Sequence, residues 1–151
     1  MSRAESASLE EAVVAEALSW VGTPYRHQAS RKGIACDCLG LVRGVWRALH
    51  GTEPEAAGPY SMDWAETGGR EQLLAAARRH FLECPDGGLK AGRVVLFRWR
   101  PHLPAKHVGV LVKEDAFVHA YEGRAVVVSQ IVPQWRRRIA GVFAFPATGE
   151  R

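Results

Sequence analysis

Apolar residues recur at helical spacing in the first part of the chain. Ser8 and Glu11 have the spacing of a capping box, in which each side chain satisfies a backbone amide at a helix start. A helix from about Leu9 to Trp20 is expected to follow, with one buried stripe made of Leu9, Val13, Val14, Leu18 and Val21. Glycine and proline in GTPY, residues 22–25, then break the helix and leave Tyr25 in a loop.

A second helix is predicted from about Cys38 to Leu49. Asp37 can cap it, because a carboxylate at that position accepts hydrogen bonds from the first-turn amides and complements the helix dipole. Gly51 is a natural stop. The apolar residues fall on one face and predict a buried helix: Leu41, Val42, Val45, Trp46 and Leu49. A third helix, rich in Ala and Arg, is expected over about Arg70 to Leu82, after a long loop from Thr52 to Gly69.

From Arg93 onward the chain changes to short runs of β-branched and aromatic residues separated by turns. These runs predict five strands, RVVLFRW (93–99), HVGVLV (107–112), AFVHAY (116–121), AVVVSQI (125–131) and IAGVFAF (139–145). Their connections are too short for crossover helices, so we expect an antiparallel sheet. Helices followed by a strand meander predict an α+β fold, with the N-terminal helices packed on one side of the C-terminal sheet.

Composition narrows the class of protein. A chain of 151 residues with 47% hydrophobic residues is expected to form one domain, residues 1–151. The net charge of +4 is compatible with anionic partners but does not indicate nucleic acid. No apolar run is long enough to span a membrane, and the first residues do not resemble a secretory signal. We therefore expect synthesis in the cytoplasm without a signal peptide.

Cys38 is the first candidate for chemistry. At a helix start, unpaired amides and the helix dipole stabilise a thiolate, so we expect a lowered pKa and a nucleophile at neutral pH. The alternatives are a small buried hydrophobic residue or a zinc ligand. Zinc is disfavoured because only one residue separates Cys36 from Cys38 and no second pair of ligands with similar spacing follows. We expect Cys36 and Cys84 to serve packing.

A nucleophilic cysteine needs a base. His107 and His119 lie in predicted strands joined by a turn at KED, residues 113–115. If Val112 faces Ala116, Gly109 lies opposite His119, and His107 is diagonal to His119 on the same face of the sheet, within side-chain reach. A slip of one residue would send the two rings to opposite faces, so the pairing is a specific prediction.

Several motifs together resemble the NlpC family of cell-wall cysteine peptidases: GTPYRHQ, CDCLGLVRGVWR, KAGRVVLF, KHVGVLV and AFVHA. The resemblance implies a papain-like fold and cleavage of peptidoglycan stem peptides, commonly between D-glutamate and diaminopimelate. We expect no cofactor and no metal. The resemblance makes Cys38 the nucleophile, His107 the general base and His119 the residue that orients His107. It also places Tyr25 beside the nucleophile, where Tyr25 and Asp37 would serve the substrate or the oxyanion.

The sequence departs from the family pattern at Leu39, where serine is usual, and at His27 and Gln28, which implies a distinct substrate rim. The sequence of residues 22–51 is most similar to a phage-type subgroup found in tailed phages and gene transfer agents. That resemblance implies assembly into a tail, with tail-tip or baseplate hub proteins as partners and the cell wall of a target cell as the site of action. Two alternatives stay open: a structural tail component with little activity, and a thiol acyltransferase on the same scaffold.

Overall fold

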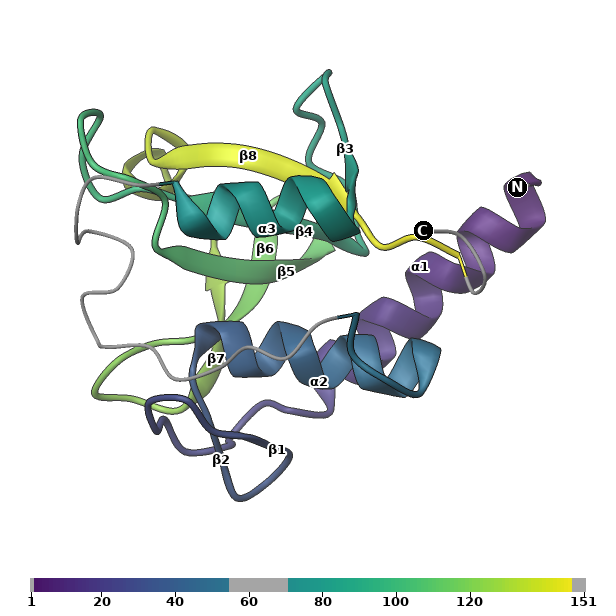
Figure 1. The fold of residues 1–151 in the computed structure, drawn as a ribbon, viewed down its shortest axis with the longest axis horizontal. Coiled ribbons are helices and arrows are strands. Elements are labelled where there is room, and N and C mark those ends of the chain that lie inside the picture. Colours follow the sequence, from purple (N-terminus) through teal and green to yellow (C-terminus); the bar gives the residue numbers. More distant parts are fainter. Residues whose placement is uncertain (1, 55–70, 148–151) are drawn as a thin grey trace.

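A six-stranded antiparallel sheet forms the centre of the fold (Figure 1). The computed structural model describes residues 2–54 and 71–147, and this part of the chain has the α+β architecture that the sequence predicts. The strands lie in the order β3-β8-β4-β5-β6-β7. Their bounds are β3 Leu82–Glu83, β4 Arg93–Phe97, β5 His107–Lys113, β6 Ala116–Ala120, β7 Val126–Gln130 and β8 Ile139–Ala144.

The five predicted strands are present as β4 to β8, but they do not form a single meander. Strands β4 to β7 follow one another across the sheet, whereas β8 returns to the far side of β4 and pairs with it. The short helix α4 (Pro133–Arg136) lies between β7 and β8, and its Trp135 packs against the sheet residues Phe97 and Phe117. The sequence does not predict β3, because two residues are too few to show an alternating pattern.

The first helix, α1 (Arg3–Leu18), begins earlier than predicted. Ser2 caps it, because the Ser2 hydroxyl accepts a hydrogen bond from the Glu5 amide at 3.1 Å. Ser2 and Glu5 have the same spacing as Ser8 and Glu11, so the helix begins about 1.7 turns before the predicted cap. The start predicted at Leu9 is therefore wrong.

The buried stripe of α1 is also narrower than predicted. Val13, Ala17 and Trp20 are buried, whereas Leu18 and Val21 are 43% and 47% exposed. The buried positions follow the spacing i, i+4 and i+7 along one face. Ala17 and Trp20 are not part of the predicted stripe. They are nevertheless the residues that pack into the core, in place of Leu18 and Val21.

The second helix, α2 (Cys38–His50), matches the prediction closely. Asp37 caps it, and Gly51 ends it with a φ of 85°. Gly44 of α2 faces Trp20, and a methyl group at Gly44 would overlap the indole ring. This glycine therefore allows the segment after α1 to pack closely on α2, and Figure 1 shows the two helices crossing beside the sheet.

The helices α1, α2 and α3 pack on one face of the sheet, as predicted. The third helix, α3 (Gln72–His80), is shorter than the predicted span to Leu82. Arg70 and most of the predicted loop, residues 55–69, lie outside the described residues. A second core cluster, which contains none of their residues, consists of Val95, Phe97, Leu111, Phe117, Ile131 and Val142. In the described ranges, none of the helices combines the length and the apolar content needed to cross a membrane.

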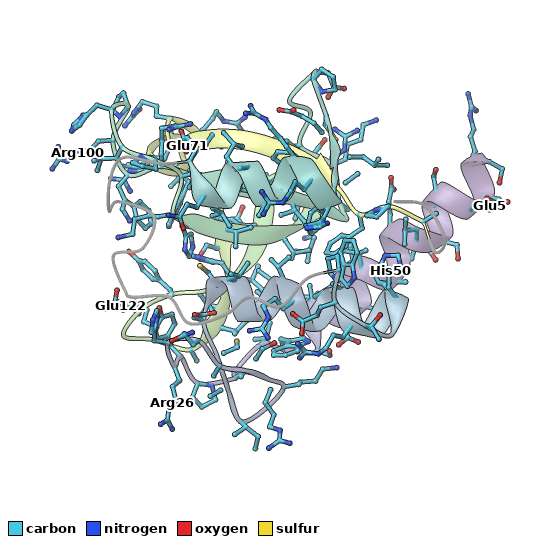
Figure 2. The ribbon with its side chains drawn as sticks, in the orientation of Figure 1. Glu5, Arg26, His50, Glu71, Arg100 and Glu122 are labelled. Atoms are coloured by element: carbon cyan, nitrogen blue, oxygen red, sulfur yellow. The ribbon has the colours of Figure 1, made fainter. Side chains whose placement is uncertain are left out.

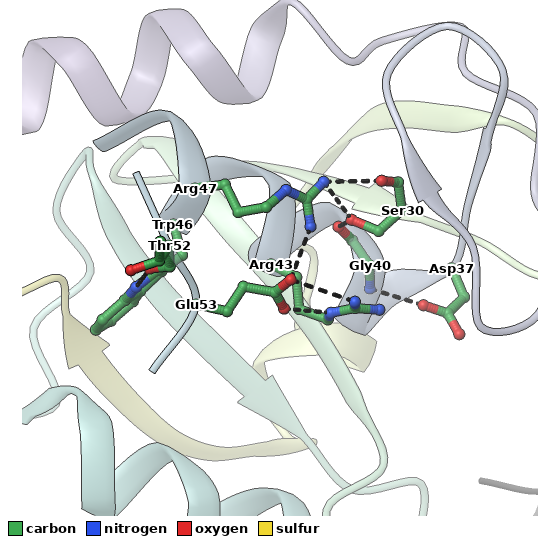
Figure 3. Close-up of polar contacts among 8 residues, drawn as sticks. All are labelled: Ser30, Asp37, Gly40, Arg43, Trp46, Arg47, Thr52 and Glu53. Carbon is green, nitrogen blue, oxygen red and sulfur yellow. Dashed lines mark hydrogen bonds and ion pairs between the residues drawn. The ribbon is translucent and has the colours of Figure 1, made fainter. Parts of the chain in front are cut away.

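A small hairpin leads into α2 and is tied to it by a polar network (Figure 3). Its strands are β1 (Ser30–Arg31) and β2 (Ala35–Cys36). Arg47 donates to the Ser30 carbonyl at 2.8 Å, and the Ser30 hydroxyl donates to the Gly40 carbonyl at 2.6 Å. Glu53 accepts hydrogen bonds from Arg43 at 2.6 Å and from Arg47 at 3.2 Å. The network therefore fixes the first turn of α2 against the hairpin.

Candidate active site

A cleft opens where α2 begins beside the ends of β5 and β6. Its cavity measures about 110 Å³. Figure 2 shows Glu122 at this end of the molecule, with Glu71 and Arg100 toward the same side and Glu5 at the opposite end. The residues that line the cleft are Tyr25, His27, Asp37, Cys38, Leu39, Trp99, Lys106, His107, Ala120, Tyr121 and Glu122. Four predicted site residues, Tyr25, Asp37, Cys38 and His107, thus share one cavity.

Cys38 is the first residue of α2, as predicted, and lines the cleft. Its sulfur lies 3.9 Å from the carbonyl oxygen of Lys106, the residue before His107. The backbone amides of Cys38, Leu39 and Val108 face the sulfur and favour its thiolate form. The start of α2 and the start of β5 therefore meet at this one atom.

The prediction of a lowered thiol pKa is wrong. Burial of the sulfur, with a further contribution from the neighbouring Asp37 carboxylate, raises the pKa of Cys38 from 9.0 to about 12. Both effects disfavour the thiolate and outweigh the facing amides. The thiol is therefore protonated at neutral pH, and it needs a base that takes its proton before or during attack.

Asp37 joins the start of α2 to the loop that carries Tyr25. The residue is 3% exposed, and its two side-chain oxygens accept hydrogen bonds from the Gly40 amide and the Gln28 amide, each at 2.7 Å. His27 Nδ1 lies 3.9 Å from Oδ2 of the same carboxylate. These bonds confirm the predicted cap and add a second contact that the sequence does not reveal. A direct contact between Asp37 and substrate or oxyanion stays a prediction.

Tyr25 lies in the cleft with Cys38, where the sequence places it. A parallel β-bridge between Tyr25 and Cys36, with a hydrogen bond from the Arg26 amide to the Cys36 carbonyl at 3.0 Å, holds the loop along the chain that leads into α2. Burial, with contributions from Cys38 and Asp37, raises the pKa of Tyr25. The phenol is therefore protonated and can donate a hydrogen bond into the cleft.

His107 and His119 lie side by side on one face of the sheet, as predicted. Nε2 of His107 is 2.8 Å from Nδ1 of His119, so the two rings share one hydrogen bond. The predicted register holds in the middle of the hairpin, where Val110 pairs with Val118. Because Nε2 of His107 is engaged with His119, Nδ1 is the nitrogen that can serve Cys38.

The space between the strands depends on Gly109. A Cβ atom at this position would lie 2.6 Å from Cδ2 of Phe117, closer than side chains can pack, and 3.2 Å from Cβ of His119, which is a tight contact. The turn itself differs from the prediction. The register shifts between Leu111 and Lys113, so Lys113 rather than Val112 faces Ala116. This bulge absorbs one residue near the turn and leaves the two histidines in the predicted relation.

Both histidines are neutral in this environment. Burial, with smaller contributions from His119 and Lys106, lowers the pKa of His107 from 6.5 to about 3. Burial lowers the pKa of His119 to about 4. A neutral imidazole carries one proton and one lone pair, so the shared hydrogen bond decides which nitrogen of His107 is basic.

Sequence reasoning missed Ser129. Its Oγ lies 2.8 Å from Nε2 of His119, on the side of that ring away from His107. Ser129 follows three valines in β7, and a single hydroxyl in such a strand gives no signal that distinguishes it from a solvent-facing polar residue. Only the pairing of β6 with β7 shows that it faces a histidine.

Aromatic rings around the histidine pair were also missed. The centroids of Trp99 and Trp135 lie 5.4 and 5.7 Å from that of His107, in stacked orientations, and Phe117 lies 4.2 Å from His119. Rings in these positions keep water from the imidazoles and account for their lowered pKa values. The sequence shows these aromatic residues, but only the return of β8 and α4 brings Trp135 beside His107.

The other cysteines lie apart from the cleft. Cys36 is buried in the larger core, where burial and Asp37 raise its pKa to about 12. Cys84 is half-buried against the second core. These positions agree with the predicted packing role. Within the described ranges, His, Cys, Asp and Glu side chains do not gather in groups of three or more that could hold a metal ion.

Curated proteins with similar sequences are murein hydrolases. The curated murein DD-endopeptidase MepS/murein LD-carboxypeptidase of Escherichia coli K12 is 28% identical over 121 residues, which cover 79% of this chain and 54% of the relative. The chain thus spans about half the length of the curated relatives it matches.

Solved structures show the same fold. The NlpC/p60 domain of the peptidoglycan hydrolase SagA has a TM-score of 0.59 at 23% identity, over 90% of this chain and 98% of that domain. An NlpC/P60 family protein from Bacillus cereus has a TM-score of 0.63 at 18% identity, over 88% of this chain and 39% of that one. The model of the NlpC/P60 family matches residues 22–143, a span that includes the whole cleft. The chain therefore belongs to the NlpC/P60 family.

Proposed function

We propose that this protein is a cysteine peptidase that hydrolyses stem peptides of peptidoglycan. The observation that carries the proposal is the cleft in which Cys38 and His107 face one cavity, with His119 bonded to the far side of the His107 ring. Membership of the NlpC/P60 family supports it, as do the names of the relatives, which are murein and peptidoglycan hydrolases.

The reaction begins with a neutral thiol and a neutral imidazole. Cys38 sulfur attacks the carbonyl carbon of the scissile amide while its proton passes to Nδ1 of His107. The backbone amide of Cys38 and the Tyr25 hydroxyl donate to the oxygen on which negative charge develops. The tetrahedral intermediate collapses to a thioester, and the protonated His107 gives its proton to the departing amine. Water, deprotonated by His107, then releases the acid and restores the thiol.

The bond that we propose is the one between D-glutamate and diaminopimelate. Its support is the resemblance of the motifs around Tyr25, Cys38 and His107 to the family pattern. The curated relatives are named for DD-endopeptidase and LD-carboxypeptidase activities, which makes those bonds the second candidates. His27 and Leu39, where the sequence departs from the pattern, both line the cleft and are the residues we propose to set the choice.

For delivery, we propose that the protein is made in the cytoplasm and assembled into the tail of a phage or gene-transfer-agent particle. Tail-tip or baseplate hub proteins would be its partners, and it would open the wall of a target cell as the particle docks. Its support is the similarity of residues 22–51 to the phage-type subgroup. Mass spectrometry of purified particles tests this directly: the protein should copurify with tails, and its absence from intact particles would overturn the proposal.

The activity is tested by incubating the purified chain with peptidoglycan sacculi and with isolated stem peptides, and by identifying the fragments by mass spectrometry. Cys38→Ala should abolish cleavage, whereas Cys84→Ala, a matched loss of a thiol outside the cleft, should retain it. The new termini identify the bond. A folded, reduced wild-type protein that cleaves nothing would overturn the peptidase and favour a structural tail component. Transfer of the acyl group to an added amine, without hydrolysis, would instead identify an acyltransferase.

A further inference from the structure

Ser129 occupies the end of a hydrogen-bonded chain that starts at the candidate base. Nε2 of His107 meets Nδ1 of His119 at 2.8 Å, and Nε2 of His119 meets the hydroxyl of Ser129 at 2.8 Å. The three residues come from β5, β6 and β7, three neighbouring strands of the sheet. The hydrogen bonds therefore run across the sheet from His107 in the cleft to the half-buried hydroxyl of Ser129 on β7.

Proton counting along this chain gives two possible orders. In the first, Nε2 of His107 carries the proton and donates to Nδ1 of His119, so the proton of His119 is on Nε2 and is donated to Ser129. In the second, every donor is reversed: Ser129 donates to His119, His119 donates to His107, and the proton of His107 sits on Nδ1. Only the first order leaves a lone pair on Nδ1 of His107, where the proton of Cys38 must arrive.

We propose that Ser129 is a positioning residue whose hydroxyl accepts the Nε2 proton of His119 and so holds both histidines in the tautomers that make Nδ1 of His107 the base. Its effect on catalysis rests on the proposed peptidase function, whereas its effect on the tautomers does not. Ser129 acts through His119, which it meets at 2.8 Å, and it is not among the residues that line the cleft.

A hydroxyl matters here because the hydrogen-bonded set of His107, His119 and Ser129 contains no carboxylate. A carboxylate only accepts hydrogen bonds, and it would fix the proton order by its charge. Neutral His119 has no fixed proton order, because its single proton can sit on either ring nitrogen. A hydroxyl can accept or donate, so Ser129 does not impose an order by itself; it supplies the acceptor without which the Nε2 proton of His119 in the competent order would have no partner. An acceptor of any kind at residue 129 should preserve the competent order, and an apolar side chain should lose it.

The test compares Ser129→Val with Ser129→Thr, which differ by a methyl group in place of a hydroxyl and both suit a strand. Ser129→Asp supplies an acceptor without a hydroxyl. Gln130→Ala is the matched control, because Gln130 is the exposed neighbour on β7 that points to the other face. Two experiments are made. Steady-state kinetics gives kcat and KM for a stem peptide, and the imidazole nitrogen spectra of 15N-histidine-labelled protein report the protonated nitrogen of His107 and His119.

We expect wild type, Ser129→Thr, Ser129→Asp and Gln130→Ala to show both histidines protonated on Nε2. Ser129→Val should show His119 in the other tautomer or in a mixture, with kcat lower by about tenfold and KM unchanged, the factor that corresponds to about 1.4 kcal/mol. Wild-type tautomers and wild-type kcat in Ser129→Val would overturn the proposal, as would a wild-type His119 protonated on Nδ1. If the wild-type protein cleaves no peptide, the peptidase proposal fails while the nitrogen spectra still decide the role of Ser129.

Discussion

Replacing Asp37 with asparagine separates two opposing effects of one carboxylate. The two oxygens of Asp37 accept the amides of Gly40 and Gln28, each at 2.7 Å, while its charge raises the pKa of the adjacent Cys38 thiol. Asparagine has nearly the same shape but only one acceptor oxygen and no charge. In Asp37→Asn, either the buried Gly40 amide or the half-buried Gln28 amide therefore loses its acceptor, and the thiolate loses a neighbouring negative charge.

The structure gives a sign and a size for both effects. Leaving one buried amide without a partner typically costs about 1–3 kcal/mol, so the free energy of unfolding, measured by urea titration, should fall by about that amount. The pKa of Cys38 should fall at the same time, because one of the two causes that raise it is removed. The thiol should then react with iodoacetamide faster than in wild type at pH 8, measured by mass spectrometry of the peptide that contains Cys38.

The matched control is Asp115→Asn, which removes the same charge from the exposed turn between β5 and β6. It should leave both stability and alkylation at their wild-type values. An Asp37→Asn protein whose stability is within about 0.5 kcal/mol of wild type would refute the role of the buried amides. Alkylation of Cys38 that is unchanged or slower in this variant would refute the electrostatic account of the thiol.

Three further predictions follow from the same geometry. Alkylation of wild-type Cys38 should keep rising with pH above 8, because burial and Asp37 raise its pKa to about 12; a plateau below pH 7 would contradict this. Gly109→Ala should lower stability by about 1–3 kcal/mol in thermal unfolding and reduce peptide cleavage, since its Cβ would lie 2.6 Å from the Phe117 ring; an unchanged midpoint would contradict the close packing. Stability in urea should rise from about pH 4 to 6.5, because the unfolded chain binds protons there that buried His107 and His119 do not; His119→Gln should flatten this rise, and a slope equal to wild type would count against the lowered pKa of His119.

The parts of the site that depend on local pattern were predictable from the sequence. The cap at Asp37 and the helix that starts at Cys38 are set by residues within one turn of each other. The meeting of His107 with His119 follows from alternation along two strands joined by a short turn, which fixes the face that each side chain occupies. These relations hold even though the bulge before Lys113 was not foreseen.

The parts that depend on distant packing were not predictable. The pKa of Cys38 reflects what buries the sulfur, and the sequence shows only the helix start. Ser129 and Trp135 join the site because β7 pairs with β6 and because the chain after β7 returns across the sheet. The start of α1 was missed for a different reason, since Ser2 and Ser8 offer the same capping pattern and the local sequence does not choose between them.

The separation of the site residues along the chain has a consequence for folding. His107 and His119 are 12 residues apart, within one hairpin, whereas Cys38 is 68 residues from the Lys106 carbonyl that its sulfur meets. Closing the longer loop costs about 1.5 kcal/mol more in chain entropy, by the logarithm of the ratio of loop lengths. A chain that has formed only the β5–β6 hairpin thus holds the paired histidines without the cysteine. The proposed reaction, with His107 as the base for Cys38, therefore requires that α2 has docked on the sheet, so a partly folded chain has no assembled candidate site.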